Sequence, residues 1–279
     1  MQPLNGKIAV VTGASRGVGK GIALGLGEAG ATVYVTGRTI EEGKSSAGRP
    51  GTIGQTAAQV TQLGGKGIAV QCDHRHEAEI ERLLQRVWSE QGQLDLLVNN
   101  AWAGYEHIVE DGQFTWANPF WQQPLWRWEA MFQSGVRGAY ITGQVAAQKM
   151  VEQRRGLIVN ISYWAAQKYM GNVAYGTAKA AVDRMAIYMA HELREHNVAA
   201  VVLYPGLVRT EGVLEAAEYY DLSNSESPQF IGRAVAGLLA DPNIMQKSGQ
   251  ILVAAALALE YGFTDIDGKQ PKPLTLETS

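Results

Sequence analysis

Seven short runs of apolar, mostly β-branched residues recur along the chain, and they constrain its fold more than any other feature. They read KIAVVTG, ATVYVTG, GIAVQCD, LDLLVNN, GLIVNIS, VAAVVLYPG and GQILVAA. These runs lack the apolar–polar alternation of a half-buried strand. Each is therefore typical of a strand that is buried on both faces of a parallel sheet.

Helix-periodic stretches separate these runs. They lie near residues 17–29, 52–64, 76–91, 125–153, 173–196 and 228–240. The alternation predicts right-handed crossovers, and hence an α/β fold with a doubly wound parallel sheet and helices on both faces. A chain of 279 residues, 46% of them hydrophobic, can bury the core of one such domain. We expect a single domain over residues 1–279, with an aromatic-rich insertion near 105–128 and a C-terminal extension near 254–279.

A glycine-rich turn follows the first predicted strand, in the sequence TGASRGVG. Gly13, Gly17 and Gly19 allow the backbone to turn tightly and to approach a pyrophosphate closely. The helix that begins there directs free N–H groups and the positive end of its dipole at the anion. A purely structural turn is the alternative, but the preceding strand and the following helix favour a phosphate site.

Ser162, Tyr175 and Lys179 stand in an otherwise apolar, alanine-rich setting. Tyr175 and Lys179 are four residues apart on a predicted helix, so they share a face, and the ammonium group favours the phenolate. This ammonium, together with a second positive charge bound nearby, can lower the phenol pKa from about 10 to about 7, which suits a general acid at neutral pH. Ser162 follows a strand and can donate a hydrogen bond to a developing alkoxide oxygen. The alternative is a helix tyrosine and a surface lysine that are paired by spacing alone.

The charge after the second strand indicates which dinucleotide is bound. An acidic residue there usually binds a free ribose 2′-hydroxyl, whereas a 2′-phosphate requires cations. This strand ends in VTGRT, which places Arg38 in that region, and Arg16 of the glycine turn can reach the same phosphate. We therefore expect NADP(H) to be favoured over NAD(H). The alternative is that both arginines are solvated surface charges.

Five motifs together resemble the short-chain dehydrogenase/reductase family. TGASRGVG, NNA at 99–101, Ser162, YGTAK at 175–179 and PGLVRT at 205–210 occur in the order and at the intervals of that family. The resemblance extends to about residue 253. Three further stretches, MFQSGVRG, AHELREH and ALALEYGFTDIDGKQ, are similar to one branch of it. The resemblance implies a Rossmann-like fold, a nicotinamide dinucleotide and hydride transfer between it and a carbonyl or alcohol.

The same resemblance carries a set of cofactor contacts onto this sequence, with Asp73 expected near the adenine. The expected cofactor-binding residues are Gly13, Ser15, Arg16, Gly17, Val18, Gly19, Arg38, Asp73, Asn100, Ala101, Tyr175, Lys179, Pro205, Gly206, Val208 and Thr210. Members of the family usually associate through their long helices, which implies a homodimer or homotetramer.

Aromatic residues indicate the substrate class. Trp102 replaces the glycine that the family usually has after NNA, and Tyr163 and Trp164 follow the catalytic serine. Such side chains suit a pocket for an apolar ketone or aldehyde. The aromatic residues of the insertion either extend this pocket or fasten the insertion to the sheet. Residues 207–227, which we call the lid segment, follow the PG motif and are expected to form a mobile lid.

One residue departs from the family pattern. Relatives have an asparagine seven residues after the position of Trp128, where it kinks a helix and holds a water through its carbonyl; this chain has Gly135. Glycine also carries a carbonyl and relaxes a helix readily, so the relay can survive. Ser134 supplies a substitute hydroxyl or caps the broken turn. Replacing Gly135 by alanine is expected to lower kcat.

Composition and the remaining motifs exclude several other classes. The net charge of −3 without long runs of one sign argues against nucleic acid, and no apolar run is long enough to span a membrane. The single cysteine and the N-terminal sequence favour the cytoplasm. We expect no metal site, because the histidines of HELREH are five residues apart and point about 140° from each other. HRH at 74–76 has no ligand spacing to complete a site.

Two other functions fit the same sequence. The first is a non-catalytic dinucleotide-binding module, and the second is an NAD-dependent alcohol dehydrogenase. The presence of all three candidate catalytic residues argues against the module, because binding alone does not require them.

Overall fold

All seven apolar runs form strands of one parallel sheet in the computed structural model, which describes residues 2–45, 48–105, 108–110 and 113–279. The strand order is β3-β2-β1-β4-β7-β8-β9, and every neighbouring pair is parallel. The strands are β1 (Ile8–Val11), β2 (Thr32–Gly37), β3 (Lys66–Gln71), β4 (Leu96–Asn99), β7 (Gly156–Ile161), β8 (Val198–Tyr204) and β9 (Ile251–Val253). The predicted doubly wound sheet is confirmed.

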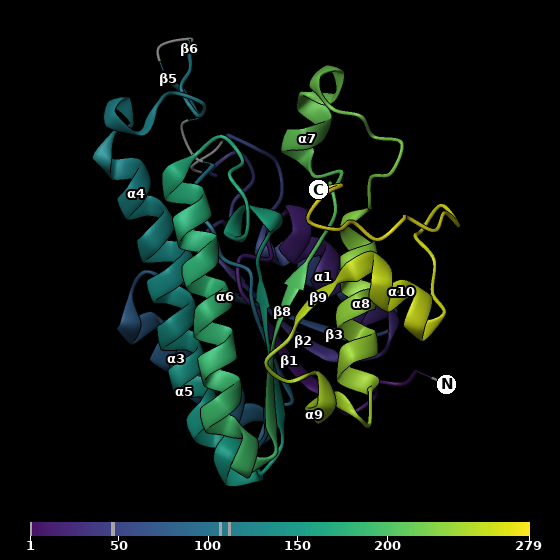
Figure 1. Cartoon of the computed structure of the whole chain (residues 1–279). Coiled ribbons are helices and arrows are strands. Elements are labelled where there is room, and N and C mark those ends of the chain that lie inside the picture. Colours follow the sequence, from purple (N-terminus) through teal and green to yellow (C-terminus); the bar gives the residue numbers. More distant parts are fainter. Residues whose placement is uncertain (1, 46–47, 106–107, 111–112) are drawn as a thin grey trace.

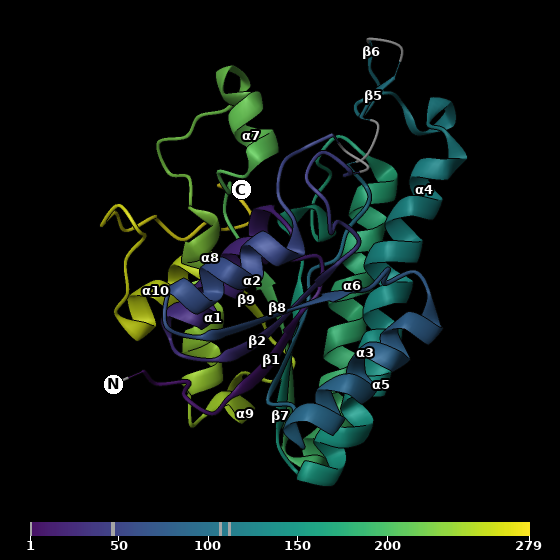
Figure 2. The same ribbon diagram turned by 180° about the vertical axis from the view of Figure 1, so that it is seen from behind.

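Helices cover both faces of this sheet, as Figures 1 and 2 show from opposite sides. One face carries α1 (Gly17–Glu28), α2 (Ile53–Gln62), α8 (Pro228–Ala240), α9 (Ile244–Lys247) and α10 (Ala254–Tyr261). The other carries α3 (Glu77–Gln91), α4 (Leu125–Met131), α5 (Gly138–Gln153) and α6 (Val173–Leu193). A separate hydrophobic core lies on each side of the sheet, and the side chains of successive strand residues point alternately into the two.

Local sequence signals set where several of these helices begin. The Thr52 hydroxyl accepts a hydrogen bond from the Gln55 N–H, and the Gln55 side chain accepts one from the Thr52 N–H, which completes a capping box for α2. Asn172 caps α6 through the N–H of Tyr175, so the cap also fixes the start of the helix that carries the candidate catalytic residues. Ser227 caps α8, and Pro228 occupies its first position.

Some elements differ from the sequence expectations. The predicted helix over 125–153 is interrupted by a π-helical turn, Phe132–Arg137, between α4 and α5. The last apolar run continues as a strand only to Val253, and the residues after it form α10. The insertion contains the short antiparallel pair β5 (Val109–Glu110) and β6 (Gln113–Phe114). The lid segment contains α7 (Glu211–Glu215), and short 3₁₀ turns lie at Phe120–Gln122, Trp164–Ala166, Arg194–His196 and Ala217–Tyr219.

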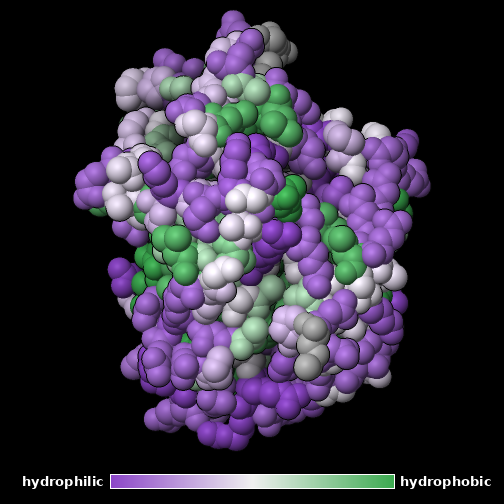
Figure 3. Space-filling view, turned by 90° about the vertical axis from the view of Figure 1, so that its right-hand side faces the viewer, coloured by the Kyte–Doolittle hydropathy of each residue, from purple (hydrophilic) through white to green (hydrophobic). Residues whose placement is uncertain are grey.

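The side of the molecule that bears α7, α8 and α10 is mostly hydrophilic. Figure 3 shows this side, where apolar side chains appear as separate patches between polar ones. Exposed apolar residues on these elements include Leu214 of α7 and Leu259 of α10. Within the described part of the chain, none of the helices combines the length and the apolar character that a bilayer crossing requires.

Candidate functional site

The strand order reverses between β1 and β4, and the loops after these two strands pack against each other. The Asn100 side chain donates hydrogen bonds to the carbonyls of Thr12 at 2.9 Å and Gly13 at 3.1 Å. Gly13 has a φ of +66°, and a Cβ on it would lie 2.8 Å from the Cα of Ala101. A side chain at residue 13 would separate the two loops, so glycine is required both for its conformation and for the close approach. The site lies where ligands bind in open α/β sheets.

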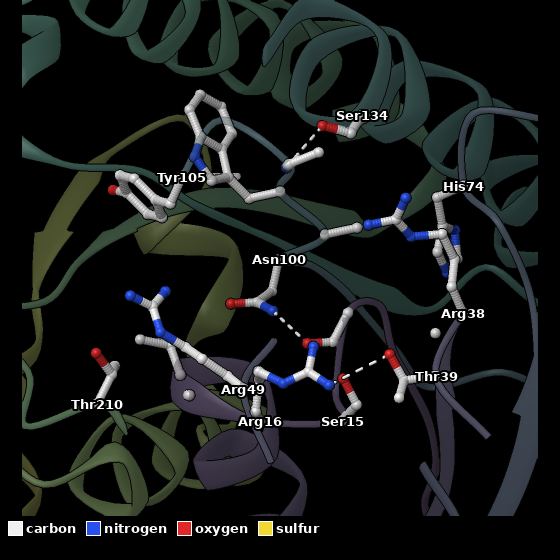
Figure 4. Close-up of a pocket in the computed structure, with 18 of the residues that line it drawn as sticks. Ser15, Arg16, Arg38, Thr39, Arg49, His74, Asn100, Tyr105, Ser134 and Thr210 are labelled. Carbon is white, nitrogen blue, oxygen red and sulfur yellow. Dashed lines mark hydrogen bonds between the residues drawn. The ribbon is translucent and has the colours of Figure 1, made fainter. Parts of the chain in front are cut away.

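A cavity of about 260 Å³ opens at this switch point. Figure 4 shows its lining, which comes from the glycine turn, the ends of β2 and β3, the loop after β4 and the lid segment. The predicted cofactor residues that line it are Gly13, Ser15, Arg16, Gly17, Val18, Gly19, Arg38, Asp73, Asn100, Ala101 and Thr210. Trp102, predicted to contact substrate, lines it as well. The predicted cofactor residues that line the cavity thus come mainly from the first half of the chain.

Four arginines line the cavity, although the sequence pattern pointed to only two. Arg16 and Arg38 were expected, whereas Arg49 comes from the loop between β2 and α2, and Arg75 from the segment between β3 and α3. Burial lowers the pKa of the Arg16 guanidinium; the nearby charges of Arg38 and Arg49 lower it further, while Glu211 raises it. The Arg16 side chain also donates hydrogen bonds to the backbone carbonyls at residues 50 and 51 and to a threonine hydroxyl. Arg16 therefore fixes the loop that carries Arg49.

Asp73 follows β3 and lines the cavity. Its carboxylate accepts hydrogen bonds from the Arg75 guanidinium, the shortest at 2.6 Å. Burial by itself raises the pKa of Asp73, but the hydrogen bonds and charge of Arg75 outweigh this effect and lower it to about 2. The side chain is thus an ionised acceptor at neutral pH, as a contact to an adenine amino group requires.

The three candidate catalytic residues lie together at the end of β7 and on one face of α6. Lys179 Nζ donates to the Ile161 carbonyl at 3.3 Å, and the Ser162 hydroxyl donates to the Lys179 carbonyl at 3.3 Å. Ser162, Tyr175 and Lys179 are all buried. Lys179 Nζ also lies 5.8 Å from the centroid of the Tyr175 ring, so the structure brings a phenol and an ammonium group of α6 together with a hydroxyl from the end of β7.

The electrostatics of this group differ from the expectation that Lys179 favours a Tyr175 phenolate. Burial raises the pKa of Tyr175 well above its usual value, and the nearby Tyr105 raises it further. Burial also lowers the pKa of Lys179 to about 8, against the opposing charge of Asp183. Desolvation disfavours both charged forms here and outweighs the proximity of the two groups. Tyr175 is thus a protonated acid and Lys179 a cation at neutral pH.

Two side chains in this region, those of Asp183 and Tyr105, were not predicted from the sequence. Asp183 lies one helical turn beyond Lys179, is buried, and accepts a hydrogen bond from the Tyr204 hydroxyl. Helical spacing could have identified it, because residues four apart share a face. The Tyr105 hydroxyl donates to the Tyr175 hydroxyl at 3.1 Å, a contact between distant segments that no sequence signal indicates.

Trp102 explains the glycine at residue 135. A Cβ on Gly135 would lie 2.5 Å from two ring carbons of Trp102, and the indole ring is 4.3 Å from Lys179 Nζ in a cation–π contact. Gly135 lies in the π-helical turn, so the helix is distorted where the kink was expected. Ser134 neither caps this turn nor is free to act as a substitute hydroxyl. Its Oγ accepts from the Ala103 N–H at 2.9 Å and donates to a carbonyl of α4.

The aromatic residues divide into two environments. Trp116 of the insertion packs edge-on against Tyr175, with ring centroids 5.4 Å apart, and so contributes to the catalytic surroundings. Trp164 is buried instead against Tyr204, with ring centroids 5.1 Å apart. Neither Tyr163 nor Trp164 belongs to the lining of the cavity. The exposed aromatic residues of the insertion are Tyr105, Phe114, Phe120, Trp121 and Trp128.

The PG motif is joined to the end of the lid segment. The Gly206 N–H donates to Glu226 at 2.7 Å, and Val208 forms a bridge with the same glutamate. Pro205 and Gly206 directly precede the lid segment, and Val208 lies at its start. Pro205, Gly206 and Val208 do not line the cavity. Burial raises the pKa of Glu226 to about 7.

The C-terminal extension holds both ends of the lid segment through one buried carboxylate. Asp265 pairs with Arg209 at 2.9 Å near the start of the segment. It also accepts hydrogen bonds from the backbone N–H and hydroxyl of Ser227 at the end. Arg209 in turn donates to the Ser225 carbonyl at 2.7 Å. The two ends are therefore fastened to one point outside the segment.

The histidines of the two motifs that were considered as metal sites lie apart from one another. His74 is buried with its Nε2 2.8 Å from the Thr36 hydroxyl, and His76 pairs with Glu79 at the start of α3. His191 lies in the last turn of α6, and His196 ends the 3₁₀ turn after it. Among the described residues, no three histidine, cysteine or acidic side chains gather in a way that could hold a metal ion.

Comparisons with known proteins agree with this geometry. A family model described as short chain dehydrogenase matches residues 7–220. Dehydrogenase/reductase SDR family member 1 of Mus musculus is 42% identical over 284 residues, which cover 97% of this chain and 86% of that protein. The crystal structure of a putative dehydrogenase from Xanthomonas campestris has a TM-score of 0.81 and 25% identity, covering 95% of this chain and 93% of that one.

A further solved structure is similar and contains a cofactor. It is a 7 alpha-hydroxysteroid dehydrogenase complexed with NADH and 7-oxo glycochenodeoxycholic acid. Its TM-score is 0.72 with 27% identity, and the match covers 90% of this chain and 94% of that one.

Proposed function

The chain belongs to the short-chain dehydrogenase family and is an oxidoreductase, and we propose that it is an NADP(H)-dependent reductase of apolar ketones or aldehydes. The observation that carries this proposal is the arrangement of Ser162, Tyr175 and Lys179 in one buried group. Binding alone would not require a buried acid, cation and hydroxyl together, whereas carbonyl reduction requires a proton donor beside the reacting oxygen.

The residues of the chain suit a nicotinamide dinucleotide at the switch point. The close packing at Gly13 leaves room for backbone alone, and the start of α1 presents N–H groups to the cavity. When bound, the cofactor would supply the hydride that adds to the carbonyl carbon. Asn100 would hold the glycine turn in shape through its two bonds to the carbonyls of that turn. Pro205, Gly206 and Val208, which lie outside the cavity lining, would support the cofactor only indirectly, through the lid segment that carries Thr210.

Residues of the chain would supply the proton and stabilise the negative charge that develops on the carbonyl oxygen. Tyr175 would donate its phenolic proton to the alkoxide oxygen as the C–H bond forms. The Ser162 hydroxyl would turn its proton from the Lys179 carbonyl and donate a hydrogen bond to the same oxygen. Lys179 would stabilise the phenolate that remains, because its buried ammonium acts strongly in surroundings of low dielectric constant. For this step Tyr105 must give up its bond to Tyr175, since the substrate oxygen needs that place.

Cofactor choice follows from charge. Arg16 and Arg38 line the cavity at the end of β2, where a 2′-phosphate would lie, and they support NADP(H). The similar dehydrogenase solved with NADH favours the other cofactor. An Arg38→Asp variant should shift the ratio of kcat/KM for NADPH over that for NADH toward NADH. An unchanged ratio would contradict the choice of NADP(H).

Substrate class follows from the aromatic surroundings of Tyr175. The rings of Trp102, Tyr105 and Trp116 have centroids 5.7, 6.0 and 5.4 Å from its ring. Apolar walls of this kind bind an apolar carbonyl compound and exclude water from the reacting oxygen. The insertion thus contributes to substrate binding through the residues nearest α6.

The direct test is consumption of NADPH with a panel of aldehydes and ketones of increasing size. We expect turnover that rises with apolar bulk and that falls by several orders of magnitude in a Tyr175→Phe variant, which still binds NADPH. Binding of NADPH without turnover of any compound would favour a non-catalytic binding module. Turnover with NADH and an alcohol in place of these would favour the alcohol dehydrogenase.

We also propose a homodimer or homotetramer in the cytoplasm. Exposed Tyr140 on α5 and Tyr188 on α6 support association through these two helices. Light scattering that reports a monomer at micromolar concentration would contradict this.

A further inference from the structure

A carboxylate from the lid segment occupies the start of α1. The backbone N–H of Gly17 donates to both carboxylate oxygens of Glu211, at 3.0 Å to Oε2 and 3.3 Å to Oε1. Arg16, the N-cap residue of α1, makes no capping hydrogen bond with its own side chain. Glu211, which is 194 residues away in the sequence, therefore places a negative charge at the positive end of the helix dipole.

A second carboxylate of the same short helix pairs with Arg49, another arginine that lines the cavity. Arg49 Nε lies 3.0 Å from Glu215 Oε2. The guanidinium also rests on the backbone of α7, because a Cβ on Gly212 would come within 2.8 Å of Arg49 Cζ. Figure 4 shows the Arg49 side chain among the residues that line the cavity, with Asn100 and Thr210 on either side of it in this view.

Both contacts use groups that a dinucleotide phosphate would need. The Gly17 N–H lies where the glycine turn presents donors to a pyrophosphate, and one donor cannot serve a carboxylate and a phosphate at full strength together. Arg49 lines the same cavity as Arg16 and Arg38, and Arg16 holds its loop in place. The cavity of about 260 Å³ is small beside the roughly 300–1,000 Å³ of typical ligand pockets, which agrees with partial filling by the chain itself.

We propose that α7 is an internal competitor of the cofactor, in which Glu211 takes the pyrophosphate position at Gly17 and Glu215 holds Arg49, a further specificity-determining residue for the 2′-phosphate. This inference rests on the proposed binding of NADP(H). Cofactor entry exchanges two carboxylate contacts for two phosphate contacts and moves α7 away from α1. Glu215 is 54% exposed, so its pair with Arg49 is screened by water and readily exchanged.

The test measures binding by titration of tryptophan fluorescence with three probes: inorganic pyrophosphate, NADH and NADPH. A Glu211→Gln variant keeps the shape of the side chain and removes its charge. We expect it to bind all three probes about two- to fivefold more tightly, which is the range for a charge at a helix N-terminus. The matched control is Glu218→Gln, since Glu218 is exposed in the next turn of the same segment. Equal affinities in the two variants, or weaker binding after Glu211→Gln, would overturn the role of Glu211.

The role of Arg49 has its own test with the same probes. An Arg49→Gln variant should weaken NADPH binding by about tenfold and leave NADH binding within about twofold, because a charged hydrogen bond to the 2′-phosphate is lost. An equal loss for both cofactors, or no loss for either, would overturn this role. Failure of the unmodified protein to bind either cofactor would instead contradict the proposed function, so the two failures are distinguishable. Melting temperatures of the variants identify any that fail to fold.

Discussion

Replacing Gly135 by alanine should test how the catalytic group is packed. The added Cβ would lie 2.5 Å from Cε3 and Cζ3 of Trp102, which is closer than real contacts allow. The ring cannot retreat freely, because on Gly104 a Cβ would meet two other ring carbons at 2.7 Å. The indole must therefore shift relative to Lys179 Nζ, which lies 4.3 Å from its centroid.

The size of the effect follows from two opposing terms. Overpacking costs about 1–3 kcal/mol, and alanine regains about 1 kcal/mol of helix propensity, so the free energy of unfolding should fall by up to about 2 kcal/mol. Loss of a desolvated cation–π contact costs about 0.5–2 kcal/mol, which corresponds to a decrease in kcat of about 2- to 30-fold. NADPH affinity should change by less than about twofold, because residue 135 does not line the cavity at the arginines.

The assay compares kcat, the NADPH dissociation constant and the melting temperature. Gly54→Ala in α2 is the matched control, since its Cβ would meet nothing closer than the Thr52 hydroxyl at 3.8 Å. That control should keep full activity and gain a little stability. Adding Trp102→Ala to Gly135→Ala should restore the lost stability in part, because the clash is removed. Unchanged kcat and melting temperature in Gly135→Ala alone would refute the packing argument.

Three further predictions rest on single residues. Reductase activity should decline above a pH of about 8, because Lys179 loses its proton there. Asp183→Asn should move this decline to lower pH, because the variant lacks the carboxylate that raises the pKa of Lys179. A pH profile of kcat/KM that is the same in the variant would contradict this. Burial lowers the pKa of His74 from 6.5 to about 4, so the unfolded chain binds the proton at a higher pH than the folded protein does. Roughly 3 kcal/mol of the free energy of unfolding should therefore be lost as the pH falls from 6.5 to 4. Urea denaturation across this range should show a smaller loss in His74→Asn, and an equal loss in the variant would contradict this. Trp164 is buried against Tyr204, so Trp164→Ala should lower the free energy of unfolding by about 3–5 kcal/mol. The same variant should reduce kcat/KM equally for short and bulky carbonyl compounds. A loss confined to bulky compounds would instead place Trp164 in the substrate pocket.

The sheet could be predicted from the sequence because strands buried on both faces leave an unmistakable apolar pattern. The run that forms β8 is buried at all seven positions. The family assignment is also confirmed, including the branch indicated by MFQSGVRG, since the 42% identity spans 97% of the chain. Helix spacing placed Tyr175 and Lys179 on one face, and chain order placed Ser162 at a neighbouring strand end, which the structure reproduces.

Other features of the site depend on contacts that sequence spacing cannot show. Glu211 reaches Gly17 across 194 residues, and Arg49 reaches Glu215 across 166. Tyr163 and Trp164 follow the serine directly in sequence, yet neither lines the cavity, and Trp164 packs into the core against Tyr204. Desolvation of Tyr175 could not be predicted either, because the burial of a phenol depends on rings from the insertion.

Asp265 has a consequence for the order in which the protein is made. It follows every strand of the sheet in the chain, the last of which ends at Val253. A ribosome that releases the chain from its N-terminus therefore exposes all seven strands before it exposes the carboxylate that joins Arg209 to Ser227. During synthesis the sheet can therefore form while the ends of the lid segment are still unfastened, and Asp265 can join them only after it has been made.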